Sequence, residues 1–114
     1  MRIIPTESQE SITLTKYLVY RRLCFMHTPN EGRRSWQNGR MLKAMGMKKG
    51  FPDYLIFNRT RSGAHGMAIE LKRTRGGILA PEQKQWLLDL QAQGWVAVVA
   101  FGAGAAIKMI DREY

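Results

Sequence analysis

A nearly continuous apolar run near the C-terminus constrains the fold of this chain most. Residues Trp95–Phe101 are almost all apolar and rich in valine, which is the pattern of a strand buried on both faces of a sheet. Such a strand needs helices packed above and below it. Pro81 stands where a preceding helix begins, and that helix extends to about Gln93 and ends at Gly94.

The remaining elements are predicted from apolar spacing and turn residues. The first helix runs from Thr6, as N-cap, to about Leu23. The other expected elements are a strand over Leu23–Met26, a short helix around Trp36–Met45, strands over Tyr54–Phe57 and Met67–Lys72 joined by residues 58–66, and a last helix over 102–111. This order predicts an α/β domain around a small mixed sheet, and 114 residues predict a single domain over 1–114.

The charge of the chain predicts a polyanionic partner. Eighteen Lys and Arg against nine Asp and Glu give a net charge of +9, which favours nucleic acid over an anionic membrane. No apolar run approaches the ~20 residues of a spanning helix, and no secretory signal is visible. The single cysteine, Cys24, excludes an internal disulfide, and no Cys/His cluster offers a zinc site. We therefore expect a cytoplasmic protein.

Asp53 and Glu70 are the informative pair of acids. Each lies at the edge of, or within, a predicted strand whose other residues are apolar. A hairpin between these strands brings both carboxylates together, and Lys72 shares a face with Glu70 because side chains alternate along a strand. Mg²⁺ prefers one or two carboxylates, with waters and a substrate phosphate. Such a metal acidifies a water and offsets charge on phosphorus, while a lysine orients the water or stabilises the anion.

The pattern Pro52-Asp53 … Glu70-Leu71-Lys72 resembles the PD-(D/E)XK nuclease signature. Over most of its length, the chain resembles stand-alone members of the virus-type replication-repair nuclease family (VRR-NUC). The motifs that carry the resemblance are Thr6-Glu7-Ser8-Gln9, His27-Thr28-Pro29-Asn30-Glu31-Gly32, Gly50-Phe51-Pro52-Asp53, Ile69-Glu70-Leu71-Lys72 and Ala80-Pro81-Glu82-Gln83, with Gly94 before the last strand. The resemblance implies a restriction-endonuclease-like core, in which helices flank the small mixed sheet.

The resemblance also implies roles for single residues. Asp53 and Glu70 match the metal-binding acids of the family, and Lys72 matches its catalytic lysine. Gln83 matches a glutamine that touches the site from the start of the following helix. In the implied mechanism Asp53, Glu70 and the main-chain carbonyl of Leu71 hold Mg²⁺ or Mn²⁺, and Lys72 polarises the attacking water.

The N-terminal acid of the family has two candidates in this chain. It falls on Glu7 when Tyr17-Leu18 sets the register, and it would complete the metal site through water. Glu10, one turn later, lies on the same core-facing stripe of the first helix and stays an alternative. A Glu in a first helical turn also interacts with the helix dipole without being a ligand.

Basic residues lie on both sides of the predicted site in the sequence. A surface that contacts phosphates is favoured over plain solvated surface, because these residues adjoin the acids. They are Arg33, Arg34, Arg40, Lys43, Lys48 and Lys49 before Asp53, and Arg73 and Arg75 after Lys72.

Simpler structural explanations exist for several of these residues. Glu70 and Lys72 alone could form a solvent-facing ion pair, and Gln83 could merely stabilise the first turn of its helix. His27 and His65 are better explained as turn residues than as metal ligands. The combination of motifs in order favours the nuclease interpretation over these alternatives.

The resulting hypothesis is a Mg²⁺- or Mn²⁺-dependent endonuclease that hydrolyses DNA. Stand-alone VRR-NUC members resemble Holliday-junction resolvases, which implies branched DNA as substrate, a homodimer and a phage or bacterial setting; two-fold symmetry suits a four-way junction. The alternatives are a non-catalytic nucleic-acid-binding module on the same scaffold, and a monomeric flap or nicking nuclease. Whether one or two metals act stays open.

Overall fold

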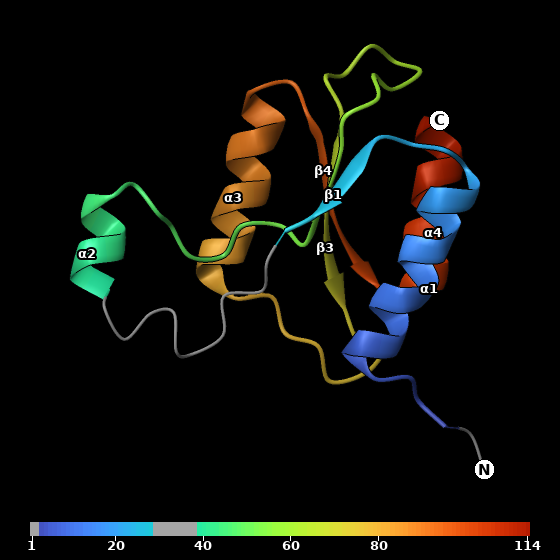
Figure 1. The fold of residues 1–114 in the computed structure, drawn as a ribbon, viewed down its shortest axis with the longest axis horizontal. Helices are drawn as coiled ribbons and strands as arrows, with labels where there is room; N and C mark the ends of the chain where they lie inside the picture. Colours follow the sequence, from blue (N-terminus) through green and yellow to red (C-terminus); the bar gives the residue numbers. More distant parts are fainter. Residues whose placement is uncertain (1–2, 29–38) are drawn as a thin grey trace.

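Helices cover both faces of a four-stranded sheet. The computed structural model describes residues 3–28 and 39–114. Its elements in chain order are α1 (Glu7–Tyr20), β1 (Phe25–His27), α2 (Gly39–Ala44), β2 (Tyr54–Ile56), β3 (Met67–Lys72), α3 (Pro81–Ala92), β4 (Val96–Phe101) and α4 (Ala103–Glu113). Figure 1 shows α1 and α4 on one side of the sheet and α3 on the other, with α2 standing apart beyond α3. The predicted α/β fold with a small mixed sheet is confirmed.

The sheet has the order β1-β2-β3-β4. The first two pairings are antiparallel, and β3 pairs with β4 in parallel. The hairpin predicted between the strands that carry Asp53 and Glu70 is therefore present as β2–β3. At the outer edge of β4, the Gln91 side chain of α3 donates a hydrogen bond to the Ala97 carbonyl at 2.8 Å.

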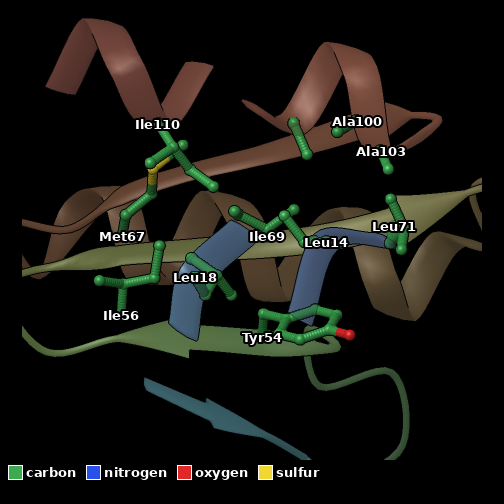
Figure 2. Packing of buried hydrophobic residues seen from close by; sticks show 11 residues of the cluster. Leu14, Leu18, Tyr54, Ile56, Met67, Ile69, Leu71, Ala100, Ala103 and Ile110 are labelled. Atoms are coloured by element: carbon green, nitrogen blue, oxygen red, sulfur yellow. The ribbon is translucent and has the colours of Figure 1, made fainter. Parts of the chain in front are cut away.

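The main core lies between the sheet and the α1–α4 layer. Figure 2 shows Leu14 and Leu18 of α1 packed over residues of β2 and β3 and against α4. Alternation along β3 sends Met67, Ile69 and Leu71 into this core, whereas Ala68 faces α3 together with Leu87. Glu70 and Lys72 share the parity of Ala68, so the α3 face of the sheet receives both charged side chains.

The predicted elements agree with the observed ones apart from their ends. The first helix ends at Tyr20 instead of Leu23, because Arg22 adopts a left-handed conformation with φ of 56°. The Arg22 N–H bonds to the Val19 carbonyl and the Leu23 N–H to the Leu18 carbonyl, which forms a Schellman motif without glycine. The first strand consequently begins later, at Phe25, than predicted.

The helix predicted around Trp36–Met45 is described only from Gly39, where α2 begins. Arg33, Arg34 and most of the predicted 27–32 turn lie outside the described residues. Within residues 3–28 and 39–114, no helix is long and apolar enough to cross a membrane.

Candidate active site

Asp53 lies at the point where β2 and β3 stop pairing. The register pairs Tyr54 with Ile69, and its continuation places Asp53 opposite Glu70 and, two residues beyond Tyr54, Pro52 opposite Leu71. The Asp53 carboxylate takes the place of a backbone partner there, because its Oδ2 accepts the Leu71 N–H at 2.8 Å. Proline has no N–H to donate to the Leu71 carbonyl. The Leu71 carbonyl, which is the predicted main-chain metal ligand, therefore receives no hydrogen bond from Pro52. It lies on the edge of β3 next to Asp53.

Glu70 is a buried acid with incomplete partners. It is 2% exposed, and its Oε1 has no hydrogen-bond partner among the described residues. Burial raises the pKa of Glu70 to about 9, with further contributions from a hydrogen bond to Asp53 and from the charges of Asp53 and Glu7. The Lys72 ammonium acts in the opposite direction. The pocket around Glu70 thus lacks the positive charge that would keep this carboxylate ionised.

The donor set suits a hard divalent cation. A buried carboxylate oxygen without a partner, a second carboxylate beside it and a main-chain carbonyl are oxygen ligands of the kind Mg²⁺ takes. No three His, Cys, Asp or Glu side chains cluster as a metal cage within the described part of the chain. Mg²⁺ sites in proteins commonly use one or two carboxylates together with waters and substrate phosphate. We conclude that the residues fit such an ion.

The structure separates the two candidate acids of α1. Glu10 is buried, and its Oε2 accepts the Ala103 N–H at the start of α4 at 3.0 Å and lies 3.5 Å from the Thr74 hydroxyl. Gly102, with φ of 96°, is required there, because a Cβ would lie 2.7 Å from that oxygen. Glu7 is exposed, lines a groove with Asp53 and contributes to the raised pKa of Glu70. Glu10 therefore joins α1 to α4, while Glu7 faces the acid pair.

The loop before Asp53 is anchored on the first turn of α3. Gly50, with φ of 83°, approaches α3 so closely that a Cβ would lie 2.8 Å from the Glu82 carbonyl carbon. Phe51 packs edge-on against Trp86 at 4.8 Å between ring centroids, and the Trp86 indole donates to the Lys49 carbonyl at 3.0 Å. The Gly-Phe-Pro sequence thereby fixes where Asp53 leaves the loop.

Gln83 has a local structural partner. Its Oε1 accepts the Ala80 N–H at 2.9 Å, half of a capping box at the start of α3. This bond agrees with the simpler interpretation of Gln83 as a residue that stabilises its own helix. Its side-chain amide nitrogen has no hydrogen bond to a described residue, and the predicted contact of Gln83 with the site stays a prediction.

The basic residues predicted to contact DNA that the structure describes lie in two groups on the surface. Arg40 and Lys43 are exposed on α2, and the Lys48 ammonium lies 5.6 Å from the Trp86 ring centroid. Arg73 and Arg75 are exposed directly after β3. Lys49 is also exposed, in the segment that leads to Asp53. Both groups adjoin the segments that carry Asp53 and Glu70.

No role at the site is predicted from the sequence for Tyr54 or Thr28, which hold the site together. Tyr54 is fully buried, and its hydroxyl donates to the Ser11 carbonyl at 3.0 Å, which joins β2 to α1. The Thr28 hydroxyl donates to the Pro52 carbonyl at 2.7 Å and its N–H to the Asp53 carbonyl at 2.8 Å. A Tyr beside an aspartate and a Thr before a proline are sequence patterns too common to predict these roles.

Comparison with known families decides what this fold belongs to. The family profile of the VRR-NUC domain matches residues 6–104, which include the hairpin, both acids and Lys72. The chain is a VRR-NUC domain protein. It belongs to a family of nucleases of the PD-(D/E)XK type, so a hydrolase that acts on DNA is supported.

A solved structure described as a "VRR_NUC domain protein" has the same fold as this VRR-NUC chain. It superposes with a TM-score of 0.78 at 24% sequence identity, over 99% of this chain and 90% of the other. At this identity the likeness shows the fold. A search of curated protein sequences finds no match.

The raised pKa of Glu70 predicts how the stability of the metal-free VRR-NUC domain depends on pH. A carboxyl with a pKa near 4.5 unfolded and about 9 folded binds more protons in the native state. Stability should therefore fall as pH rises from about 4.5 to about 9. Glu70→Gln should remove this dependence and be about 1–3 kcal/mol more stable than wild type at pH 8, because an amide takes up no proton on folding. Urea unfolding of both proteins in EDTA at pH 5–9 measures their free energies of unfolding. A difference between wild type and Glu70→Gln that stays constant with pH would contradict the prediction.

The different surroundings of Glu7 and Glu10 predict opposite effects of their removal. Glu10→Ala should cost about 1–3 kcal/mol, because the Ala103 N–H loses its buried partner. Glu7→Ala should cost less than about 1 kcal/mol and weaken Mn²⁺ binding several-fold. Chemical unfolding and calorimetric Mn²⁺ titration of both variants test this. A stable Glu10→Ala protein that has lost Mn²⁺ affinity would show instead that Glu10 is the ligand.

Proposed function

We propose that residues 1–114 form one domain that is a divalent-metal-dependent endodeoxyribonuclease selective for branched DNA. The observation that carries the proposal is the buried Oε1 of Glu70 beside Asp53, which has no hydrogen-bond partner among residues 3–28 and 39–114. A core acid in this setting is costly unless a cation compensates its charge. A protein that only binds DNA has no use for two converging acids within a chain of net charge +9. We place its activity in the cytoplasm of a bacterial or phage-infected cell.

In this proposal the residues of the chain divide the chemical work. Asp53, Glu70 and the Leu71 carbonyl would hold Mg²⁺ or Mn²⁺, with Glu7 completing the site through water. When bound, the cation supplies a Lewis acid toward the phosphate and an acidified water. The Leu71 N–H fixes the orientation of the Asp53 carboxylate. Lys72, on the same face of β3 as Glu70, would orient the attacking water and stabilise the developing anion with its ammonium.

The DNA is held mainly through its phosphates. The exposed cations of α2, of the segment before Asp53 and of the loop after β3 have the charge for backbone contacts. These surfaces carry long cationic side chains, which neutralise phosphates irrespective of base sequence. Selection by DNA shape, and thus by branching, follows from such contacts.

The proposal predicts metal-dependent cleavage that requires the acid pair. Labelled four-way junction, flap and linear duplex are incubated with Mg²⁺, Mn²⁺ or EDTA. Wild type should cleave the junction fastest and be inactive in EDTA, while Glu70→Gln and Lys72→Ala should lose at least about a hundredfold in rate, as loss of charge stabilisation does elsewhere. Arg59→Ala, in the β2–β3 loop, is the control and should keep full activity.

Each alternative has its own outcome in that experiment. DNA binding without cleavage of any substrate would favour a binding module on a nuclease scaffold. Faster cleavage of flaps than of junctions by a monomer would favour a flap or nicking nuclease. Full activity of Glu70→Gln would overturn the proposed site.

We further propose that the protein acts as a homodimer. Two equal sites related by two-fold symmetry fit the symmetric strands of a four-way junction. The six-residue α2 has no buried residue, and its Met41 and Met45 side chains are 65% and 70% exposed. So short a helix is unstable without packing partners, which favours α2 as part of the contact between copies.

The dimer proposal predicts the mass in solution and a way to change it. Light scattering at micromolar concentration should give twice the 13.1 kDa of the chain. Met41→Glu combined with Met45→Glu should give a monomer that still unfolds cooperatively. A monomeric wild type contradicts the homodimer, and a dimeric double variant contradicts the assignment of α2.

A further inference from the structure

A groove leads away from the acid pair along α1. It begins at Glu7 and Asp53, and its α1 wall carries Ser8, Ser11, Ile12, Thr15 and Lys16. Successive turns bring these residues onto one stripe of the helix, because each lies three or four positions from another of the set. Apart from Glu7 and Asp53 at its start, the described lining has no acid. The groove therefore offers hydroxyls and an ammonium next to the candidate metal site.

The wall of the groove is held in place by Tyr54. The His27 ring stacks on the Tyr54 ring at 4.3 Å between centroids, with 11° between the planes, and His27 also lines the groove. The Tyr54 hydroxyl gives its proton to the Ser11 carbonyl and lies 2.8 Å from the Thr15 hydroxyl. α1 and β1 are thereby fixed relative to Asp53, which precedes Tyr54. These contacts fix the backbone of the groove wall at Ser11 and Tyr54.

Lys16 gives the groove its charge. Its side chain is exposed and has no salt bridge or hydrogen bond with residues 3–28 or 39–114. An ammonium without an acid partner beside a row of hydroxyls has the chemistry of a phosphate contact. α2 and α3 lie on the other side of the sheet from α1 (Figure 1). A strand that contacts the cations of α2 and reaches Lys16 crosses the sheet where Asp53 and Glu70 lie.

We propose that this groove binds the sugar–phosphate backbone of the cleaved strand directly beside the scissile bond, with Lys16 contacting one phosphate. The proposal rests on the proposed nuclease function and adds a binding subsite to it. The bases are left outside the contact, since the groove offers hydroxyls and charge but no arrangement for reading base edges. It assigns a function to residues outside the acidic and basic groups described above.

The first test is DNA binding in EDTA, where no cleavage occurs. Lys16→Ala should weaken binding of a fluorescent four-way junction about 3–10-fold and reduce the salt dependence by about one phosphate contact. Arg59→Ala removes the same charge from the loop at the opposite end of β2 and should bind like wild type. Thermal unfolding of both variants should match wild type, because both side chains are exposed. Equal affinities of Lys16→Ala and wild type would overturn the proposal.

The second test locates the contact on the DNA. The bond cleaved by wild type is mapped first, and single neutral methylphosphonate linkages are then placed at each of the neighbouring phosphates. One linkage within three nucleotides of the cleaved bond should weaken binding by wild type but cause no further loss for Lys16→Ala. Losses that simply add for every linkage would show that Lys16 contacts no phosphate there.

The two proposals fail in different ways. If wild type cleaves DNA and Lys16→Ala binds normally, the groove is wrong and the nuclease stands. If wild type cleaves nothing but Lys16→Ala still binds more weakly than Arg59→Ala, the groove binds DNA and the nuclease assignment is wrong.

Discussion

The hydrogen bond from the Leu71 N–H to the Asp53 carboxylate is the contact on which the candidate site depends. It replaces a backbone pairing that Pro52 cannot complete, at the position where β2 ends. This bond fixes the orientation of the first acid, while the missing N–H of Pro52 leaves the Leu71 carbonyl without a backbone donor from β2. Because Thr28 and Gly50 hold the flanking loop from two sides, few movements of Asp53 remain available.

The sequence predicts the parts of the site that follow from strand periodicity. Asp53, Glu70 and Lys72 come together because a two-residue period and a hairpin place them there, and both are readable from residues 54–72. The end of α1 cannot be predicted from the sequence, because the residue with the left-handed conformation that ends the helix is Arg22 and not a glycine. Helical periodicity likewise cannot separate Glu7 from Glu10. Only the packing of Gly102 and the start of α4 against Glu10 makes that distinction.

The net charge of +9 is composed of parts with different roles. Exposed cations lie on α2, in the segment before Asp53 and directly after β3, whereas two of the nine acids are withdrawn into the protein: Glu10 at the start of α4 and Glu70 under the site. The exposed surface is therefore more basic than the composition suggests. The residues that attract DNA are thus different from those that compensate the charge of the buried carboxylate. Substitutions in one group can therefore have little effect on the function of the other.

The bond from Gln91 to the Ala97 carbonyl bears on edge-to-edge association of the sheet. β4 is apolar and, among residues 3–28 and 39–114, has a neighbouring strand on one side only, so its outer edge is a template on which another chain could add a strand. The Gln91 amide occupies one of the carbonyls that such a strand would need. A residue on the surface of α3 therefore limits edge-to-edge aggregation of a sheet whose most apolar strand lies at its border.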